Sequence, residues 1–182
     1  MRPGAASITL ANMPFLTPRP LLFSKSTIRS PVDDIDLKAV INVPDTPVWV
    51  AAGSGGRLLR SQDNGRSWTV ASSGHAGSFL TLTHDATSAQ ILVGGETGLV
   101  GHSRDLGKTW SVTRTHMPEP ATPVSGFHRF GGLLVATSAR GRLLTSTDDA
   151  GTWSLLQADS NAFFTDAAYD PVHSHIVVTG HN

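Results

Sequence analysis

Cysteine is absent from this chain of 182 residues, which excludes disulfides and thiolate metal ligands and leaves the redox compartment open. Acidic and basic residues number 14 each, so the chain lacks the basic excess that is typical of nucleic-acid binding. No stretch shows a convincing helical period. The most apolar segment, residues 13–23, contains three prolines and is too short to span a membrane.

What the sequence does have is a repeat, S-x-D-x-G-x-[ST]-W, in three copies that begin 42 and 43 residues apart. A period in the low forties, with alternating apolar residues around each copy, is typical of β-propeller blades. We expect the residues of the motif to be structural. They are Ser61, Asp63, Gly65, Trp68, Ser103, Asp105, Gly107, Trp110, Ser146, Asp148, Gly151 and Trp153.

Each copy lies between two strand-like runs, so the motif predicts a hairpin turn. Its Asp is expected to accept hydrogen bonds from backbone N–H groups a few residues on, and its Gly to supply a positive φ. The Trp is expected to cover the turn and to donate its N–H to a carbonyl. The third copy has Ala150 where Gly is expected, followed by Gly151. Either Gly151 takes the special conformation in a shifted turn, or Ala150 is strained by roughly 1 kcal/mol.

Alignment on the motif predicts four short strands per repeat and therefore an all-β propeller of four-stranded antiparallel blades. The expected first strands are 37–41, 79–83, 124–127 and 163–169. The expected second strands are 48–52, 91–93, 133–136 and 176–178. Among the second strands, Trp49, Leu92, Leu134 and Val177 are taken as equivalent because they are 43, 42 and 43 residues apart.

The domain organisation follows from the same alignment. Residues 1–36 match no blade and contain five prolines, so we expect an extended N-terminal arm. Residues 37–182 are expected to form a partial propeller of about 3.5 blades, which predicts the N-terminal part of a longer propeller. The expected blades are 37–74, 79–120 and 124–159, with half of a fourth over 163–182.

The motif resembles the Asp-box, or BNR repeat, of sialidase-type propellers, over about residues 37–182. The compact period and runs such as Gly-Arg-Leu-Leu-x-Ser-x-Asp are most similar to the photosystem II stability/assembly factor family. That resemblance implies a non-catalytic scaffold that binds partner proteins, such as a membrane-complex subunit, without a cofactor and in the periplasm or another extracytoplasmic space. It also implies that the motif turns lie on the face opposite the ligand site.

Candidate binding residues follow from this choice of face. If the motif turns join third and fourth strands, the turns between second and third strands lie on the opposite face. Those turns carry Arg57, Glu96, Arg140 and Arg142. Arginine favours bidentate contacts with carboxylates, so we expect these residues to hold an extended protein or peptide partner.

Two alternatives remain open: a sialidase-type glycoside hydrolase, and a carbohydrate-binding or adhesion propeller. The resemblance implies that a sialidase would need a Tyr–Glu pair and three Arg that hold the substrate carboxylate. The single tyrosine, Tyr169, lies in an alternating strand, Glu96 lies in a turn and Glu119 lies between two prolines. His173 and His175 are on one strand face, but no third metal ligand follows, so we expect a solvated strand there. No phosphate-binding glycine loop is present, because the glycine-rich run 53–56 is not followed by a helix.

Overall fold

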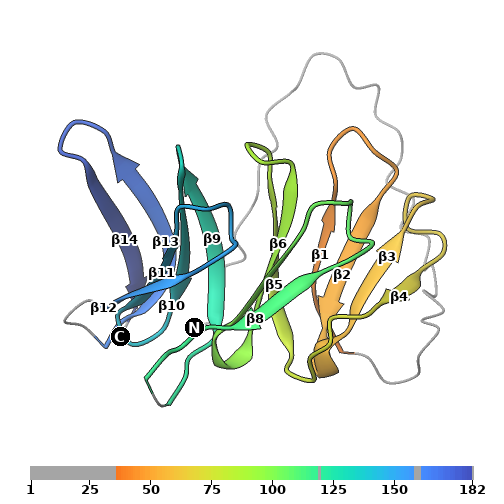
Figure 1. The fold of residues 1–182 in the computed structure, drawn as a ribbon, viewed down its shortest axis with the longest axis horizontal. Coiled ribbons are helices and arrows are strands. Elements are labelled where there is room, and N and C mark those ends of the chain that lie inside the picture. The colour runs from red at the N-terminus through yellow and green to blue at the C-terminus, as the bar shows by residue number, and fades with distance from the viewer. Residues whose placement is uncertain (1–35, 119, 158–160, 182) are drawn as a thin grey trace, which may run out of the picture.

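The computed structural model describes residues 36–118, 120–157 and 161–181, whose strands form four antiparallel sheets side by side (Figure 1). Three sheets have four strands and the fourth has two. The first strand of each sheet contacts the first strand of the next, in the order β1, β5, β9 and β13. These strands therefore form the inner side of the arrangement. The predicted all-β propeller with four-stranded antiparallel blades, about 3.5 of them, is confirmed.

We call the sheets blades 1 to 4, and the strands within each full blade follow one another in sequence order. Blade 1 contains β1 (Leu37–Asn42), β2 (Trp49–Gly53), β3 (Leu58–Ser61) and β4 (Thr69–Ala71). Blade 2 contains β5 (Phe79–Asp85), β6 (Gln90–Gly95), β7 (Leu99–Ser103) and β8 (Ser111–Arg114). Blade 3 contains β9 (Val124–Phe130), β10 (Leu133–Ser138), β11 (Arg142–Ser146) and β12 (Ser154–Gln157). Blade 4 contains β13 (Phe163–Asp170) and β14 (His175–His181).

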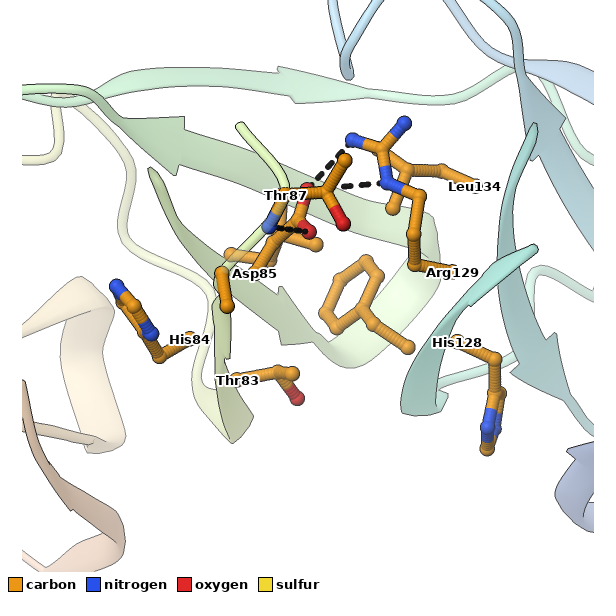
Figure 2. Close-up of a pocket in the computed structure, with 10 residues that line it drawn as sticks. Thr83, His84, Asp85, Thr87, His128, Arg129 and Leu134 are labelled. Carbon is orange, nitrogen blue, oxygen red and sulfur yellow. Dashed lines mark hydrogen bonds and ion pairs between the residues drawn. The ribbon is translucent and has the colours of Figure 1, made fainter. Parts of the chain in front are cut away.

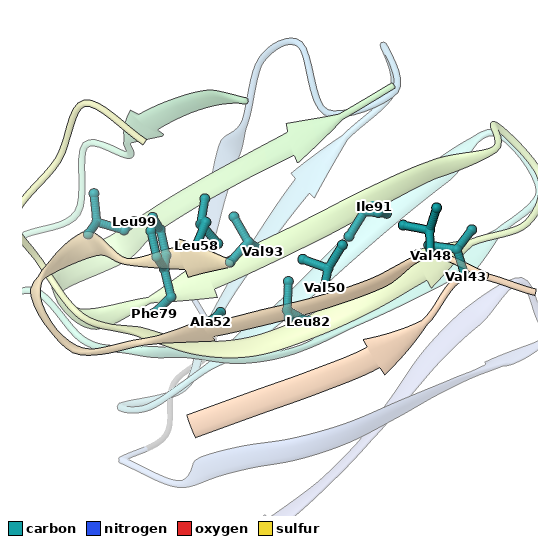
Figure 3. Packing of buried hydrophobic residues seen from close by; sticks show 10 residues of the cluster. All are labelled: Val43, Val48, Val50, Ala52, Leu58, Phe79, Leu82, Ile91, Val93 and Leu99. Atoms are coloured by element: carbon teal, nitrogen blue, oxygen red, sulfur yellow. The ribbon is translucent and has the colours of Figure 1, made fainter. Parts of the chain in front are cut away.

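The core lies between the blades, where the faces of neighbouring sheets meet. Every residue of β6 is buried, because blade 2 is covered on both faces. Ile91 and Val93 pack toward blade 1 with Val50 and Phe79, as Figure 3 shows. Leu92, which points to the other face, packs toward blade 3. Successive residues of one strand thus serve two different interfaces.

This alternation corrects one equivalence predicted from the sequence. The residue paired with the motif Ser is Trp49 in blade 1, Ile91 in blade 2 and Leu134 in blade 3. Leu92 is therefore not the equivalent of Trp49. A shift of one residue moves a side chain to the other face of a sheet. The motif serines are 42 and then 43 residues apart, an order that Trp49, Ile91 and Leu134 follow and that Trp49, Leu92 and Leu134 reverse.

The three motif copies, here called the motif turns, connect the third and fourth strands of blades 1 to 3, as predicted. In the second turn, Ser103 Oγ donates to Asp105 Oδ1 over 2.8 Å and accepts the N–H of Gly107 over 2.8 Å. The two oxygens of Asp105 accept the N–H and the hydroxyl of Thr109, over 2.9 and 2.6 Å. Trp110 Nε1 donates to the carbonyl of Gly107 over 3.2 Å. The same Ser–Asp and Asp–hydroxyl bonds recur in the other two turns.

In the third motif turn the positive φ falls on Ala150, at 68°, and the shifted turn through Gly151 is wrong. The N–H of Ala150 donates to Ser146 Oγ over 3.0 Å, as the glycine N–H groups do in the first two turns. The Ala150 side chain is buried in the core between blades 2 and 3. Burial of its methyl group, at about 0.8 kcal/mol per buried carbon, offsets much of the strain.

The converse substitutions test this balance. Gly65→Ala is expected to lower the free energy of unfolding by about 1 kcal/mol, because φ is 81° and an added Cβ meets nothing closer than Trp68, at 3.8 Å. Gly107→Ala is expected to lower it further, because the added Cβ would lie 2.8 Å from Val50 Cγ2. Urea unfolding of both variants beside the wild type gives the comparison. Equal losses of stability in the two variants would show that Val50 can move away from the added Cβ at no cost in free energy.

Hydrogen bonds to the motif turns also join neighbouring blades. Arg60 of blade 1 donates from Nε to the carbonyl of Leu106 in the second turn, over 2.7 Å. Arg104 of blade 2 donates from Nη2 to the carbonyl of Asp149 in the third turn, over 3.0 Å. Leu106 and Asp149 hold the same place in their turns. Each of these turns is therefore fastened to the blade that precedes it. The predicted N-terminal arm lies outside the described residues, as does Glu119.

Candidate functional site

The face opposite the motif turns is formed in part by the turns between second and third strands. The hairpins between first and second strands, such as β1–β2 and β13–β14, all point to the upper edge of Figure 1. Each β2–β3-type turn contains two successive residues with positive φ, namely Gly55 and Gly56, Thr97 and Gly98, or Arg140 and Gly141. These tight turns hold the residues beside them at fixed places on the blade ends.

Arg57 follows the first of these turns and lines an open groove of about 410 Å³. Two glycines before Arg57 form one wall, and residues 70–76 form the other. Ser73 bonds both walls, since its hydroxyl donates to the carbonyl of Gly56 over 2.7 Å and accepts the N–H of His75 over 3.2 Å. A hydrogen bond therefore joins the two walls, and the half-buried Arg57 lies at the side of the groove.

Glu96 and Arg140 are both exposed at the corresponding turns of blades 2 and 3. Glu96 Oε2 accepts the N–H of Ser78 over 3.4 Å, which directs the carboxylate toward the chain entering β5. Arg140 has a φ of 59°, at the place that Gly55 occupies in blade 1. Arg57, Glu96 and Arg140 thus lie at the same end of three successive blades.

Arg142 does not belong with these residues, although it occupies the same place in its repeat as Arg57. Its exposed fraction is 5%, and its Nη1 donates to the carbonyl of Pro120 over 2.9 Å. This bond fastens the loop between blades 2 and 3 to β11. Arg142 is therefore a buried structural residue, and its predicted role in partner contact is corrected on that ground.

A second concavity, of about 250 Å³, lies between β5 and β9 on the other side of the blades. Figure 2 shows Arg129 of β9 facing Asp85 of β5, while His84 and His128 point away from that pair. Arg129 Nε donates to Asp85 Oδ2 over 3.2 Å, and its Nη2 donates to Asp149 Oδ1 over 2.7 Å. Leu92, Phe127 and Leu134 also line the pocket.

Both partners of the Asp85–Arg129 pair are charged. Burial alone would raise the pKa of Asp85, but hydrogen bonds from Arg129 and Ser88 outweigh burial and hold the pKa below its ordinary value. Burial would lower the pKa of Arg129, but the two aspartates raise it. Sequence reasoning missed this pair, which joins blade 2 to blade 3. The available signal was Asp85 directly before a turn, but the blade contact that brings Arg129 to it is not local.

The described residues considered for catalysis are not brought together, since Tyr169 lies in β13 of blade 4 and Glu96 lies in the β6–β7 turn of blade 2. Tyr169 stacks on Phe130 with ring centroids 5.9 Å apart. Within residues 36–118, 120–157 and 161–181, no three His, Cys, Asp or Glu side chains are grouped to hold a metal ion. In the same part of the chain, no helix is long and apolar enough to cross a membrane.

No protein-family model matches this chain, and no curated protein matches its sequence. Solved structures match its fold. YCF48 from Cyanidioschyzon merolae gives a TM-score of 0.59 at 14% identity, over 84% of this chain and 52% of that chain. A structure of YCF48 bound to D1 peptide gives 0.56 at 13% identity, over 80% and 48%. The WD40 propeller domain of Doa1 gives 0.57 at 18% identity, over 80% and 48%.

These matches and the sheet topology define the chain as a β-propeller protein. The chain spans about half the length of these three structures. Propellers host many unrelated activities, so the fold leaves the function to be argued from the surface.

Proposed function

We propose that this chain is a non-catalytic propeller scaffold that binds an extended protein or peptide segment on the face opposite the motif turns. The observation that carries the proposal is the groove beside Arg57, with Glu96 and Arg140 at the same end of the next two blades. Guanidinium groups on rigid turns suit the carboxylates and carbonyls of an extended segment.

The neighbours in fold support this class of function. They include YCF48 bound to D1 peptide and a WD40 domain. The finer proposal is an Asp-box propeller related to photosystem II assembly factors, whose partner is a subunit of a membrane complex. It rests on the motif and on the likeness to YCF48, at 13–14% identity.

The test uses two substitutions that the repeat itself offers. Arg140→Gly places the blade 1 residue at the blade 3 turn and relieves a positive φ of 59°. Arg57→Leu places the blade 2 residue, Leu99, at the blade 1 turn. Because Arg140 is exposed and Arg57 is half-buried at the blade end, the double variant is expected to fold and to bind the D1 peptide at least tenfold more weakly than the wild type. Fluorescence anisotropy of the labelled peptide measures this, and a pull-down from native membranes extends it to whole partners.

The matched control is Arg66→Ala with Lys108→Ala, which removes two exposed cations from the motif turns on the other face. It is expected to bind as the wild type does. An equal loss of peptide affinity in both double variants would reject binding on the Arg57 face and indicate a general effect of charge. A fluorogenic sialoside assay is run on the same preparations. Turnover that survives purification would reject the scaffold and favour the glycoside hydrolase.

A further inference from the structure

The β13–β14 hairpin brings two imidazoles together at its tip. The rings of His173 and His175 stack with centroids 6.0 Å apart and planes at 24°. Asp170 is paired with His175 across the hairpin, and its Oδ2 lies 2.6 Å from His173 Nδ1. Asp170 also accepts the N–H of Val172 on Oδ1 over 2.9 Å, so the backbone of the turn fixes the carboxylate.

A carboxylate on one nitrogen of a histidine is the arrangement that orients metal-binding imidazoles. With Nδ1 held by Asp170, His173 presents Nε2 as its coordinating atom, and two thirds of its side chain is exposed. Two imidazoles that share a tetrahedral ion at 2.0–2.1 Å have ring centres about 5 Å apart. The observed 6.0 Å is about 1 Å longer, and both side chains are exposed, so rotation about their side-chain torsions can turn one nitrogen of each ring toward a shared ion.

We propose that His173 and His175 form a two-ligand site for a divalent transition metal of the zinc, copper and nickel group, with Asp170 as the positioning residue. Imidazole nitrogen suits these ions. The sequence argued against a metal because no third ligand follows. In the structure the third residue of the cluster is Asp170, which orients His173 and does not itself bind the metal. Water completes the coordination, so the site is open.

The same turn occurs in blade 2 without the histidines. Asp85 and Gln90 are paired across the β5–β6 hairpin as Asp170 and His175 are across β13–β14. Asp85 accepts the N–H of Thr87 on Oδ1 over 3.1 Å and the hydroxyl of Ser88 on Oδ2 over 2.5 Å. The residue before each second strand has a positive φ in both hairpins, 49° and 56°. Blade 2 thus shows that Ser and Gln fit where blade 4 has His173 and His175.

The experiment titrates the full chain with Zn²⁺ by calorimetry and compares it with His173→Ser/His175→Gln, which installs the blade 2 residues. The wild type is expected to bind one more equivalent of Zn²⁺ than this variant. In the variant, affinity at the proposed site is expected to fall by at least 100-fold. Asp170→Asn is expected to weaken the site by about 10-fold or more while it keeps the bond to the Val172 N–H. Electron paramagnetic resonance with Cu²⁺ is expected to show two imidazole nitrogens in the wild type.

Melting temperatures without metal confirm that the variants are folded, and the single variant His175→Gln supplies a second test. Equal Zn²⁺ stoichiometry in the wild type and the double variant would overturn the proposal. An unchanged affinity in His175→Gln, or a copper spectrum with one imidazole nitrogen, would also overturn it.

Discussion

Arg129→Met is expected to lower the free energy of unfolding by about 3–5 kcal/mol, the largest effect of any single substitution considered for this chain. Asp85 is 5% exposed, and without the guanidinium it becomes a buried charge that has lost its ion pair. Asp149 loses the same partner. Because Arg129 lies in blade 3 and Asp85 in blade 2, the loss falls on the joint between the blades. Urea unfolding at neutral pH measures the change.

Two further variants separate charge from packing. Arg66→Met removes an exposed arginine of the first motif turn and is expected to change stability by less than about 0.5 kcal/mol. Adding Asp85→Asn to Arg129→Met is expected to restore part of the loss, since the amide keeps an oxygen for the Thr87 N–H without a buried charge. If the double variant were less stable than Arg129→Met, the uncompensated charge would not be the cause.

Asp105→Ala is expected to cost about 2–3 kcal/mol, since one charged carboxylate holds the second motif turn together. Its oxygens accept from Ser103, Thr109 and the N–H of Lys108. Burial alone would raise the pKa of Asp105, but these hydrogen bonds, led by the Thr109 hydroxyl, lower the pKa to about 2. A folded pKa below the ordinary value of 3.8 means that the ionised form stabilises the fold.

The stability that the Asp105 carboxylate contributes depends on pH. The contribution of Asp105 is fully present above pH 3.8 and is lost as the pH falls toward 2. Stability curves of the wild type and Asp105→Ala should therefore converge on acidification in that range. Lys108→Ala, which leaves the backbone N–H in place, serves as the control and should run parallel to the wild type. Parallel curves for Asp105→Ala would contradict the role of the carboxylate. Loss of the proposed peptide binding at an unchanged melting temperature would make the motif turns functional.

Local chemistry made much of the fold predictable. Asp105 and Trp110 were predicted to bond to their own turn, and both do so within five residues of sequence. The repeat period predicted where the strands of the four sheets lie along the chain, because every blade repeats the same strands. One equivalence was wrong, because Leu92 faces the other side of its sheet, and one question stayed open, whether Ala150 or Gly151 takes the positive φ. The order of the motif spacings, 42 and then 43 residues, would have corrected the equivalence, but burial of the Ala150 methyl group between two blades is not visible in spacing.

The binding face was less predictable for a related reason. Arg57 and Arg142 hold the same repeat position, yet Arg57 lines a groove while Arg142 is buried under a loop. Arg142 is held by the loop before β9, which supplies the Pro120 carbonyl. Non-local contacts such as Arg129–Asp85 are set by the packing of one blade on another. A single sequence carries no direct record of them.

The fastening of the motif turns to the preceding blade has a consequence for how such chains evolve. Arg60 and Arg104 both donate to a backbone carbonyl, and the residue that offers it is Leu106 in one turn and Asp149 in the other. The bond to a main-chain carbonyl does not itself depend on the side chain of that residue, whereas the positive φ at Leu106 and Asp149 and the bond from Arg129 to Asp149 Oδ1 do constrain these positions. Blades can therefore be duplicated or exchanged with different residues at the accepting position, provided that the neighbouring blade keeps an arginine donor for the carbonyl.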